Sequence, residues 1–545
     1  MKPDREVVDA AKAKRALSDL SRRDILKGGA AGVAAVGAGS LLAACGSSSS
    51  SSTSSSGSTM GGGTPQRGGN LRVAMVGGTP DDTLEADAAY NFPQVMRNFA
   101  LYNGLVALDA DGKAVSNVLA EEISGSKDAK TWTIRLKPEI TFHDGKPLTA
   151  KDVLFTFNRI ADPKLLLTGI TALEPVDLKA AKVVDDLTLR LPMKAPYATF
   201  VEQICNNYYF GIVPEGYDPS KPIGTGPFKY ESFTPGEQSV FVRNPNYFKS
   251  GLPHLDKLTI IDSFAEPTAA LNALKSGTVD VFENAPPDLY NQVSGDSTLH
   301  TLVSAPGLWV PFTMRADVKP FNDERVRQAF RLLINREQML ASSVGGLGVV
   351  ANDVYGLHDP CYDTSLTREQ DIEQAQALLK QAGQEGLTVE LVTAPIAAGA
   401  TESAQVFVQQ AKEAGVTVNL RSTSVTTFFT NYLKWPFAQD FLAYDPIMNM
   451  AAQTSIPGAP FGTTHFDDPE FNSLYKQVNE TVDNAGRCDL KSQMQKILFD
   501  SGAYIIPTFN KTVDIMSTTV NGFAENAGTG IPLGNGDWEN AWISS

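Results

Sequence analysis

Before residue 221, apolar and polar residues alternate with the period of two that is typical of strands. In the segment 131–136 the apolar positions share one face, and they are Trp132, Ile134 and Leu136. Residues 181–191 read as two further strands joined by a tight turn. Between these segments, Thr149 and Asp152 have the spacing of a capping box, which predicts the start of a helix. The pattern indicates an antiparallel, hairpin-rich region.

After residue 320 the apolar period becomes that of a helix. A helix is predicted from Asn322, and the residues of its apolar stripe are Val326, Ala329, Phe330, Leu333 and Ile334. A strand over 387–394, a helix over 401–415 and a strand over 416–421 follow. Two strands joined through a helix are expected to be parallel, with a right-handed crossover. This part of the chain is predicted to form an α/β lobe.

The first 44 residues have the organisation of an export signal. Basic residues precede an uncharged run at 28–44, which is shorter than the roughly 20 apolar residues of a membrane span. Arg22 and Arg23 before this run resemble a twin-arginine signal, although Ile25 stands where Phe is more common. A Sec-type signal with incidental arginines fits the same residues.

The uncharged run leads to Cys45, and residues 42–45 read LAAC, which resembles the lipobox of bacterial lipoproteins. In such proteins the chain is cut before the Cys and its sulfur is acylated, and two or three acyl chains hold a protein stably on a membrane. Residues 45–67 are rich in Ser and Gly, as in a flexible tether. We therefore expect an export signal at 1–44, lipidation of Cys45, and a body held on the outer face of the cytoplasmic membrane, in a periplasmic or extracellular location.

Composition excludes some partners. The chain has 545 residues and a formal net charge of −15, and because its first 45 residues carry a net charge of +3, the mature chain would carry −18. That charge argues against nucleic acid and anionic membrane surfaces as partners. A body of about 500 residues is long enough for two or three domains.

Cysteine and histidine usage gives little sign of a metal site. The four cysteines are Cys45, Cys205, Cys361 and Cys488. Cys361 and Cys488 fall in the predicted α/β lobe and could form a disulfide, but two buried free thiols fit the sequence equally well. The five histidines, at positions 143, 254, 300, 358 and 465, form no pair with metal-ligand spacing. No metal or cofactor is expected.

Six sequence blocks follow one another along the body. They are LAEEISGSKDAKTWTIRLKPEITFHDGKPLTAKDVLFTFNRI (119–160), PIGTGPFKY (222–230), RNPNYFKSGLPHLDKL (243–258), LKSGTVDV (274–281), KPFNDERVRQAFRLLINRE (319–337) and APFGTTHFDDPEFNSLY (459–475). This ordered set resembles the family 5 extracellular solute-binding proteins of ABC importers, which include oligopeptide, dipeptide and nickel binders. The resemblance covers essentially all of residues 66–545.

The resemblance implies an α/β fold of the periplasmic-binding-protein type, with two hinged lobes, an interlobe cleft and an extra subdomain on the first lobe. The expected division is lobe I at 68–100, 222–315 and 510–545, subdomain Ib at 101–221, and lobe II at 316–509. A small solute such as a peptide would be captured as the lobes close. The partners implied are an ABC permease and its ATPase subunits, with the binding protein itself a monomer.

Ligand contacts in such proteins come from variable loops, so they transfer poorly from one family member to another. Peptide binders of the family share a Trp-rich segment that ends in an Asp, and the region 433–450 here has no clean match, which puts a peptide ligand in doubt. Asp445 is the first candidate for a charged contact and Asp440 the second. Aromatic walls are expected from Tyr90, Trp309, Trp435 and Tyr444.

Several residues of the six blocks are expected to serve the scaffold. Gly224, Gly226 and Pro227 would shape a turn, and Arg325 and Arg327 would cap a helix or pair on the surface.

The sequence lacks the motifs of several other functional classes. The chain has no G-x-S-x-G and no H-E-x-x-H, and an S-x-x-K at 124–127 has no K-T-G downstream, so an exported hydrolase lacks support. It also lacks a P-loop motif, so ATP would be hydrolysed by other chains. A chaperone or signalling protein on the same fold remains compatible with the sequence. The prediction is a binding protein without catalytic residues.

Overall fold

The computed structural model describes residues 63–80, 82–89, 91–108, 115–264, 266–526 and 528–544. The predicted export signal with Arg22 and Arg23, the lipidation residue Cys45 and the candidate Tyr90 lie outside the described residues. Within that part of the chain, no helix combines the length and the apolar character that a membrane span requires.

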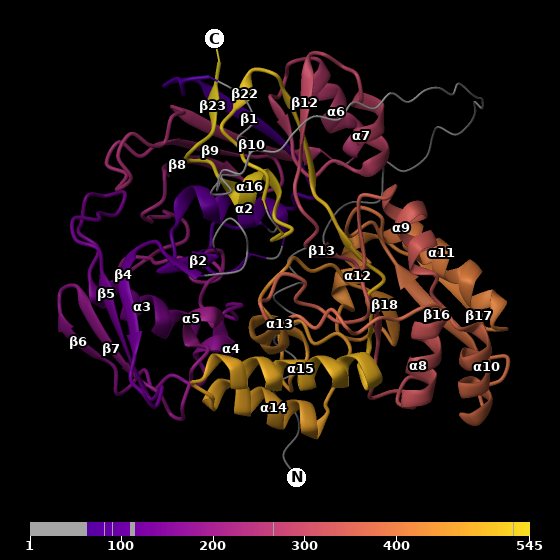
Figure 1. Cartoon of the computed structure of the whole chain (residues 1–545). Coiled ribbons are helices and arrows are strands. Elements are labelled where there is room, and N and C mark those ends of the chain that lie inside the picture. The colour runs from indigo at the N-terminus through magenta and orange to yellow at the C-terminus, as the bar shows by residue number, and fades with distance from the viewer. Residues whose placement is uncertain are drawn as a thin grey trace, which may run out of the picture.

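Lobe I is built on a seven-stranded mixed sheet with the order β12-β21-β11-β1-β10-β9-β8, at the top of Figure 1. Its strands are β1 (Asn70–Val76), β8 (Phe228–Thr234), β9 (Gln238–Arg243), β10 (Lys257–Phe264), β11 (Val281–Phe282), β12 (Leu299–Val303) and β21 (Val513–Ser517). β1 runs parallel to both β10 and β11, and the other pairs are antiparallel. The sheet therefore joins three parts of the chain that are far apart in sequence.

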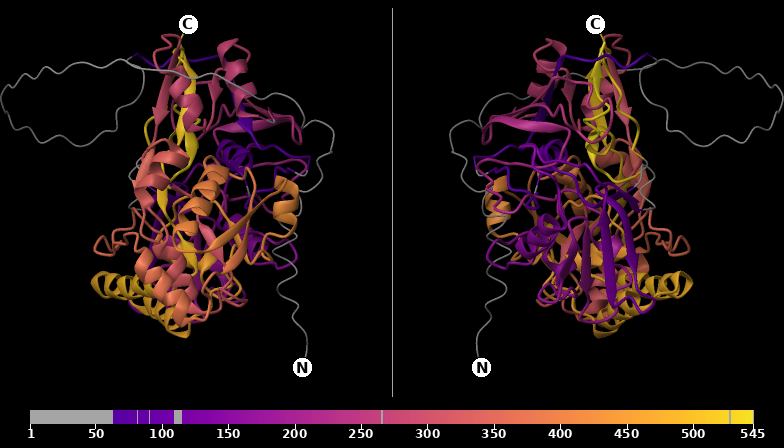
Figure 2. Two further views of the ribbon diagram at one scale, coloured as in Figure 1. Left: turned by 90° about the vertical axis from the view of Figure 1, so that its right-hand side faces the viewer. Right: turned by 90° about the vertical axis from the view of Figure 1, so that its left-hand side faces the viewer.

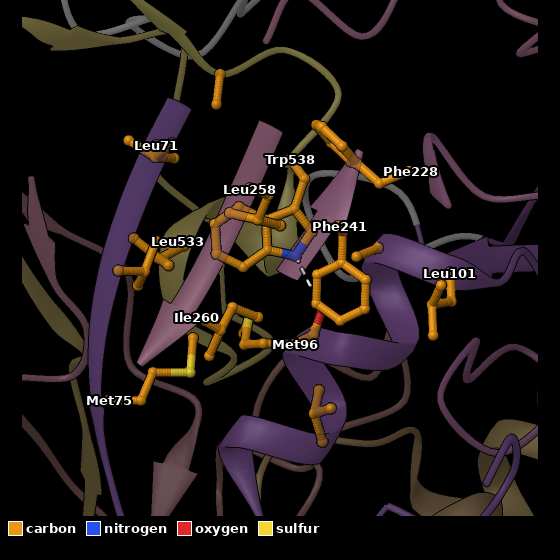
Figure 3. Packing of buried hydrophobic residues seen from close by; sticks show 14 of the residues in the cluster. Leu71, Met75, Met96, Leu101, Phe228, Phe241, Leu258, Ile260, Leu533 and Trp538 are labelled. Carbon is orange, nitrogen blue, oxygen red and sulfur yellow. Dashed lines mark hydrogen bonds between the residues drawn. The ribbon is translucent and has the colours of Figure 1, made fainter. Parts of the chain in front are cut away.

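Helices cover both faces of this sheet because the apolar residues of β1 alternate between them. Leu71, Val73 and Met75 pack toward α2 (Phe92–Leu101), whereas Ala74 packs toward α6 (Pro267–Lys275) and α7 (Pro287–Val293). The C-terminal segment returns to this core, where the indole nitrogen of Trp538 donates to the carbonyl of Met96 at 3.0 Å (Figure 3). This contact ties the end of the chain, with the short α16 (Pro532–Gly536) and the β22 (Val520–Asn521) and β23 (Trp542–Ile543) pair, to lobe I.

Subdomain Ib carries an antiparallel sheet with the order β4-β5-β7-β6. Its elements are β4 (Ala120–Gly125), β5 (Thr131–Leu136), β6 (Lys182–Asp185), β7 (Thr188–Pro192), α3 (Ala150–Ile160), α4 (Ile170–Leu173) and α5 (Phe200–Gln203), and a ribbon of β2 (Val106–Leu108) and β3 (Val115–Asn117) joins it to lobe I. The predicted hairpins and the helix start are confirmed, since the Asp152 carboxylate accepts hydrogen bonds from the backbone N–H of Thr149 at 2.9 Å and from its hydroxyl at 2.7 Å.

Lobe II is an α/β layer on a five-stranded sheet with the order β17-β16-β18-β14-β19. The strands are β14 (Phe312–Met314), β16 (Thr388–Thr393), β17 (Thr417–Ser422), β18 (Phe437–Gln439) and β19 (Tyr504–Ile505), and the helices are α8 (Glu324–Leu332), α9 (Arg336–Val344), α10 (Ile372–Gln381), α11 (Ala400–Glu413), α12 (Val425–Thr430), α13 (Ile447–Thr454), α14 (Pro469–Glu480) and α15 (Asn484–Ser501). The predicted β16-α11-β17 unit is confirmed, with its two strands parallel. Figure 2 shows lobe II and subdomain Ib on opposite sides of the molecule, both below lobe I.

Two chain segments cross between the lobes side by side. β13 (Leu308–Trp309) leads from lobe I into lobe II, and β20 (Thr508–Asn510) leads back. The two strands pair antiparallel, and β15 (Gly348–Val350) adds a third strand to β20. Because both crossings lie in one small sheet, we expect this sheet to act as the hinge between the lobes.

The structure gives the glycines at 224 and 226, and Arg327, roles that differ from those expected from the sequence. Gly224 and Gly226 do more than shape a turn, since a Cβ on Gly226 would lie 2.4 Å from the carbonyl carbon of Leu101 at the end of α2. Arg327 does not pair on the surface, because its side chain is buried and donates to the carbonyl of Ser501 at 2.7 Å. Unlike Arg327, Arg325 is exposed and pairs with Asp323 at 2.6 Å, as expected.

The open question about the cysteines resolves in favour of a disulfide. Cys361 and Cys488 are bonded, with a Cα–Cα distance of 5.0 Å and a sequence separation of 127. The bond joins the loop before α10 to α15, and Cys205 is a buried free thiol.

Candidate functional site

The main pocket lies where lobe I, subdomain Ib and lobe II meet. It holds about 610 Å³ free of protein atoms, counting the solvent at its mouth. We call it the aromatic chamber, and its lining residues are Ala89, Asn91, Phe92, Val95, Tyr208, Tyr209, Tyr432, Phe441, Leu442, Ala443, Asp445, Met450, Gln453, Phe461 and Ile531. Most of these side chains are apolar or aromatic, so the chamber can remove a ligand from water without requiring one particular shape.

The lobe I wall of the aromatic chamber is fixed by the start of α2. Asn91 caps this helix, since its side-chain oxygen accepts a hydrogen bond from the backbone N–H of Gln94 at 2.9 Å. The amide nitrogen of Asn91 donates to Asp82 at 3.3 Å, and Asp82 pairs with the fully buried Arg97 at 2.9 Å. Arg97 also pairs with Asp262, so one buried cation between two carboxylates holds this wall in place.

Asp445 supplies the charged group of the aromatic chamber and connects lobe II to subdomain Ib. One of its carboxylate oxygens accepts a hydrogen bond from the side-chain amide of Asn206, and the other accepts from Gln453 of α13 at 3.0 Å. Burial raises the pKa of Asp445 to about 7, because the two amide donors offset only part of the lost hydration. A cation placed beside this carboxylate would favour its ionised form.

A second, smaller hollow lies beyond Tyr208 and Ile531, which line both spaces. It holds about 310 Å³ free of protein atoms, counting solvent at its mouth. We call it the amide chamber, and its lining residues are Phe99, Ala107, Leu108, Cys205, Asn206, Asn207, Tyr208, Tyr444, Thr529, Ile531 and Asn535. Three asparagines, a threonine and two tyrosines give this hollow a partly polar but uncharged lining.

Below the chambers, subdomain Ib and lobe II are joined by buried polar contacts. Lys491 of α15 pairs with Glu202 of α5 and with Asp359 of lobe II, each at 3.0 Å. Next to this triad, the side-chain amide of Gln203 donates to the carbonyl of Met448, and that of Asn449 donates back to the carbonyl of Gln203, both at 3.0 Å. These contacts hold the lobes together around the chambers.

The structure brings some of the predicted residues to the site and leaves others out. Asp445 lines the aromatic chamber and Tyr444 lines the amide chamber. Asp440 stands behind the wall, where it accepts a hydrogen bond from the hydroxyl of Tyr432. Tyr90 lies outside the described residues.

Neither tryptophan candidate lines a chamber. Trp309 is 1% exposed and packs in the lobe II core, with its ring 6.0 Å from that of Tyr355 and 5.7 Å from that of Tyr504. Trp435 donates its indole N–H to the carbonyl of Phe428 at 3.0 Å. Both residues have the packing role that competes with ligand contact for any large aromatic side chain.

Sequence reasoning missed the segment that forms the wall between the two chambers. Residues 205–210 read CNNYYF, and Asn206 through Tyr209 all line one or both hollows. Two adjacent asparagines followed by two tyrosines combine polar and aromatic groups outside a predicted helix or strand. This combination could have identified the segment as a candidate binding wall. Among the described residues, no group of three His, Cys, Asp or Glu side chains is arranged to hold a metal ion.

Comparison with known proteins gives two family matches. The model for bacterial extracellular solute-binding proteins, family 5 (middle region), matches residues 114–455. The model for twin-arginine translocation signals matches residues 19–39, which favours that export route over the Sec alternative.

Curated relatives and solved structures agree with the first match. The glutathione-binding protein GsiB of Pectobacterium atrosepticum is 26% identical over 490 residues, which cover 83% of this chain and 91% of that protein. The nickel-binding periplasmic protein of Escherichia coli is 27% identical, and the match covers 54% of this chain and 58% of that protein.

Two structures with low sequence identity share the fold. The periplasmic binding protein AgaA of A. tumefaciens R10, solved with agropinic acid, has a TM-score of 0.78 at 23% identity and covers 88% of this chain and 99% of its own. DppA of Helicobacter pylori, solved with the peptide STSA, has a TM-score of 0.78 at 18% identity with the same coverage. The relatives are binding proteins rather than enzymes.

Proposed function

Because this chain belongs to the bacterial extracellular solute-binding proteins of family 5, we propose that its aromatic chamber captures a small solute that carries a protonated amine. The chain is exported and acts as the substrate-binding component of an ABC importer. The solute would be enclosed between the lobes and passed to a membrane permease, whose partner subunits hydrolyse ATP.

One observation supports an amine above other groups. The aromatic chamber is largely apolar, and Asp445 is the one charged side chain among its described lining residues. An ammonium group at this carboxylate would make a charge-assisted hydrogen bond in a site of low dielectric, where such bonds are strong. The rest of the solute would be apolar enough to pack against Phe92, Phe441 and Phe461.

The names of the relatives make a peptide the second candidate, since a peptide also has an amino terminus. GsiB is a glutathione-binding protein, and several further relatives, among them one of Brucella ovis, are putative peptide-binding proteins of ABC transporters. Asp445 would then hold the amino terminus, and the peptide's carboxylate would need a partner of its own.

The test begins with the natural solute. Small molecules released by denaturing protein purified from its own host are identified by mass spectrometry, and an amine is expected among them. Calorimetry then compares the wild type with Asp445→Asn, whose shape is the same but whose charge is lost. Loss of a charge-assisted hydrogen bond worth about 1.5–3 kcal/mol predicts affinity about 10-fold to 150-fold weaker. Equal affinity of the two proteins for the identified solute would contradict the proposal.

The lipid anchor is the second part of the proposal. Acylation at Cys45 would hold the protein on the membrane from which the permease is served, with residues 46–67 as the tether. Mass spectrometry of the mature amino terminus should find an acylated Cys45, and Cys45→Ser should move the protein to the soluble exported fraction. The protein is expected to be a monomer, which light scattering measures directly.

A further inference from the structure

We infer that the amide chamber is a second subsite for the same solute, and that it takes an uncharged hydrogen-bonding group, so the protein selects amines that lack a carboxylate. This inference rests on the proposed function, because it requires an amine at Asp445. The inferred solutes therefore differ from free peptides and amino acids, which carry a carboxylate as well as an amine.

The two chambers are adjacent, because they share lining residues. Tyr208 and Ile531 line both of them. Asn206 lines the amide chamber, yet its side-chain nitrogen donates to Asp445 in the aromatic chamber. A solute whose ammonium reaches Asp445 therefore has the amide chamber within one side chain's length of its charged end.

The amide chamber contains polar atoms that lack partners. The side-chain nitrogen of Asn207 donates to the carbonyl of Tyr102 at 3.0 Å, but its side-chain oxygen has no hydrogen-bond partner among the described residues. The hydroxyl of Tyr444 likewise has none in that part of the chain, and this side chain is 3% exposed. Buried polar groups without partners are rare in folded proteins, because each carries the full cost of lost hydration. A carboxamide or a hydroxyl group of the solute could donate to the Asn207 oxygen and accept from the Tyr444 hydroxyl.

The charge around the amide chamber disfavours an anion. No described residue that lines either chamber carries a positive charge. Two buried cations described above are already paired, Lys491 with Glu202 and Asp359, and Arg97 with Asp82 and Asp262. A carboxylate placed here would be buried without a counter-ion, which is costly.

The pKa values of residues that line the amide chamber also indicate that negative charge is disfavoured there. Burial raises the pKa of Tyr208 and of the Cys205 thiol, and in each case the negative charge of Asp445 raises it further. For Tyr444, burial raises the pKa first, and Asp359 adds to the rise. His358 packs its ring against Tyr444, but its Nε2 lies 2.6 Å from the carbonyl oxygen of Pro306 and the residue does not line the chamber.

The segment that brings Asn535 to the amide chamber has an uncommon backbone conformation. Leu533, Gly534 and Asn535 follow one another with φ values of 53°, 62° and 71°, in the left-handed region that non-glycine residues avoid. Asp514 holds this turn, since its carboxylate accepts from the backbone N–H of Leu533 at 2.7 Å. Such strain persists only where the surroundings impose it, and it is concentrated at functional sites. Here it presents Asn535 and Ile531 to the chamber.

A matched set of three probes tests the inference on the mature protein by calorimetry at pH 7. Phenethylamine has the amine and ring alone, phenylalaninamide adds a carboxamide, and phenylalanine carries a carboxylate at the same position. We expect phenylalaninamide to bind about 10-fold tighter than phenethylamine, because its carboxamide adds hydrogen bonds. We expect it to bind at least about 10-fold tighter than phenylalanine, because the carboxylate of phenylalanine would be buried without a counter-ion.

Two variants locate the effect. Tyr444→Phe removes one hydroxyl from the amide chamber and should weaken phenylalaninamide about fivefold while leaving phenethylamine unchanged. Tyr504→Phe, in the lobe II core, is the matched control and should change neither affinity. If phenylalanine binds as tightly as phenylalaninamide, or if Tyr444→Phe weakens both amines equally, the second subsite is refuted and the amine site at Asp445 stands. If none of the three probes binds, both proposals fail.

Discussion

The raised pKa of Asp445 makes a prediction that needs no ligand. In the folded protein this pKa is about 7, against an ordinary value of 3.8, because the carboxylate is buried between the lobes. Between these two values the folded state keeps a proton that the unfolded state has lost. The free energy of unfolding should therefore fall as pH rises through this interval, at about 1.36 kcal/mol per pH unit.

The magnitude follows from the interval. Between pH 5 and pH 8, ionisation of Asp445 should remove about 2.5 kcal/mol of stability from the wild type, whereas Asp445→Asn has no proton to lose. The difference in unfolding free energy between the variant and the wild type should therefore rise by this amount in favour of the variant. Any fixed cost of fitting an asparagine amide against Asn206 and Gln453 cancels, because it does not depend on pH.

Urea unfolding at several pH values measures this difference, with Asp128→Asn as a control. Asp128 is exposed and its pKa is lowered by a hydrogen bond from the Ser126 hydroxyl, so its variant should lose stability relative to the wild type as pH rises through the ordinary carboxyl range. A difference for Asp445→Asn that stays flat from pH 5 to pH 8 would refute the argument that this carboxylate is buried and proton-binding. Small-angle scattering at pH 8 adds a second readout, because lobe opening would return the ionised group to water and raise the radius of gyration.

Three further predictions concern the scaffold. Gly226→Ala should cost about 3 kcal/mol in urea unfolding, because the added Cβ meets the end of α2, and an unchanged midpoint would contradict the close approach. Lys491→Met should lower stability by about 3–5 kcal/mol and raise the radius of gyration, because Glu202 loses its counter-ion, and an unaltered scattering profile would mean that the pair does not hold the lobes together. Replacing both Cys361 and Cys488 by serine should lower the unfolding free energy by about 2–4 kcal/mol, and a protein whose midpoint is the same with and without reductant would contradict a stabilising disulfide.

The local sequence pattern was enough to predict the helices and strands whose signals lie within a short stretch of the chain. The alternation in β5, the capping box of α3 and the order of β16, α11 and β17 can each be read within a short stretch of sequence, and each is present in the structure. The two-lobed fold was predictable only through the family resemblance, because the lobe I sheet joins β1, β10 and β21, which periodicity cannot bring together.

The candidate site was only partly predictable, for a physical reason. Whether an aromatic residue packs in a core or lines a chamber depends on its tertiary contacts. The sequence around Trp309 and Tyr444 does not distinguish these two roles. Asp445 was chosen because it lies in the region 433–450, which corresponds to the segment that ends in an Asp in the family's peptide binders. The wall formed by Asn206 through Tyr209 was missed because its residues belong to subdomain Ib, and the sequence does not show that this subdomain faces lobe II.

The polar contact between subdomain Ib and lobe II affects how long a solute stays bound. The lobes are linked at two places, by the paired strands β13 and β20 and by the Lys491 triad. We expect lobe opening to require the triad to break, so residence time should follow the lifetime of this contact, which lies away from the solute, as well as the strength of the contacts to the solute. Ligands of quite different affinity could then leave at similar rates, and a permease that separates α5 from α15 would release all of them.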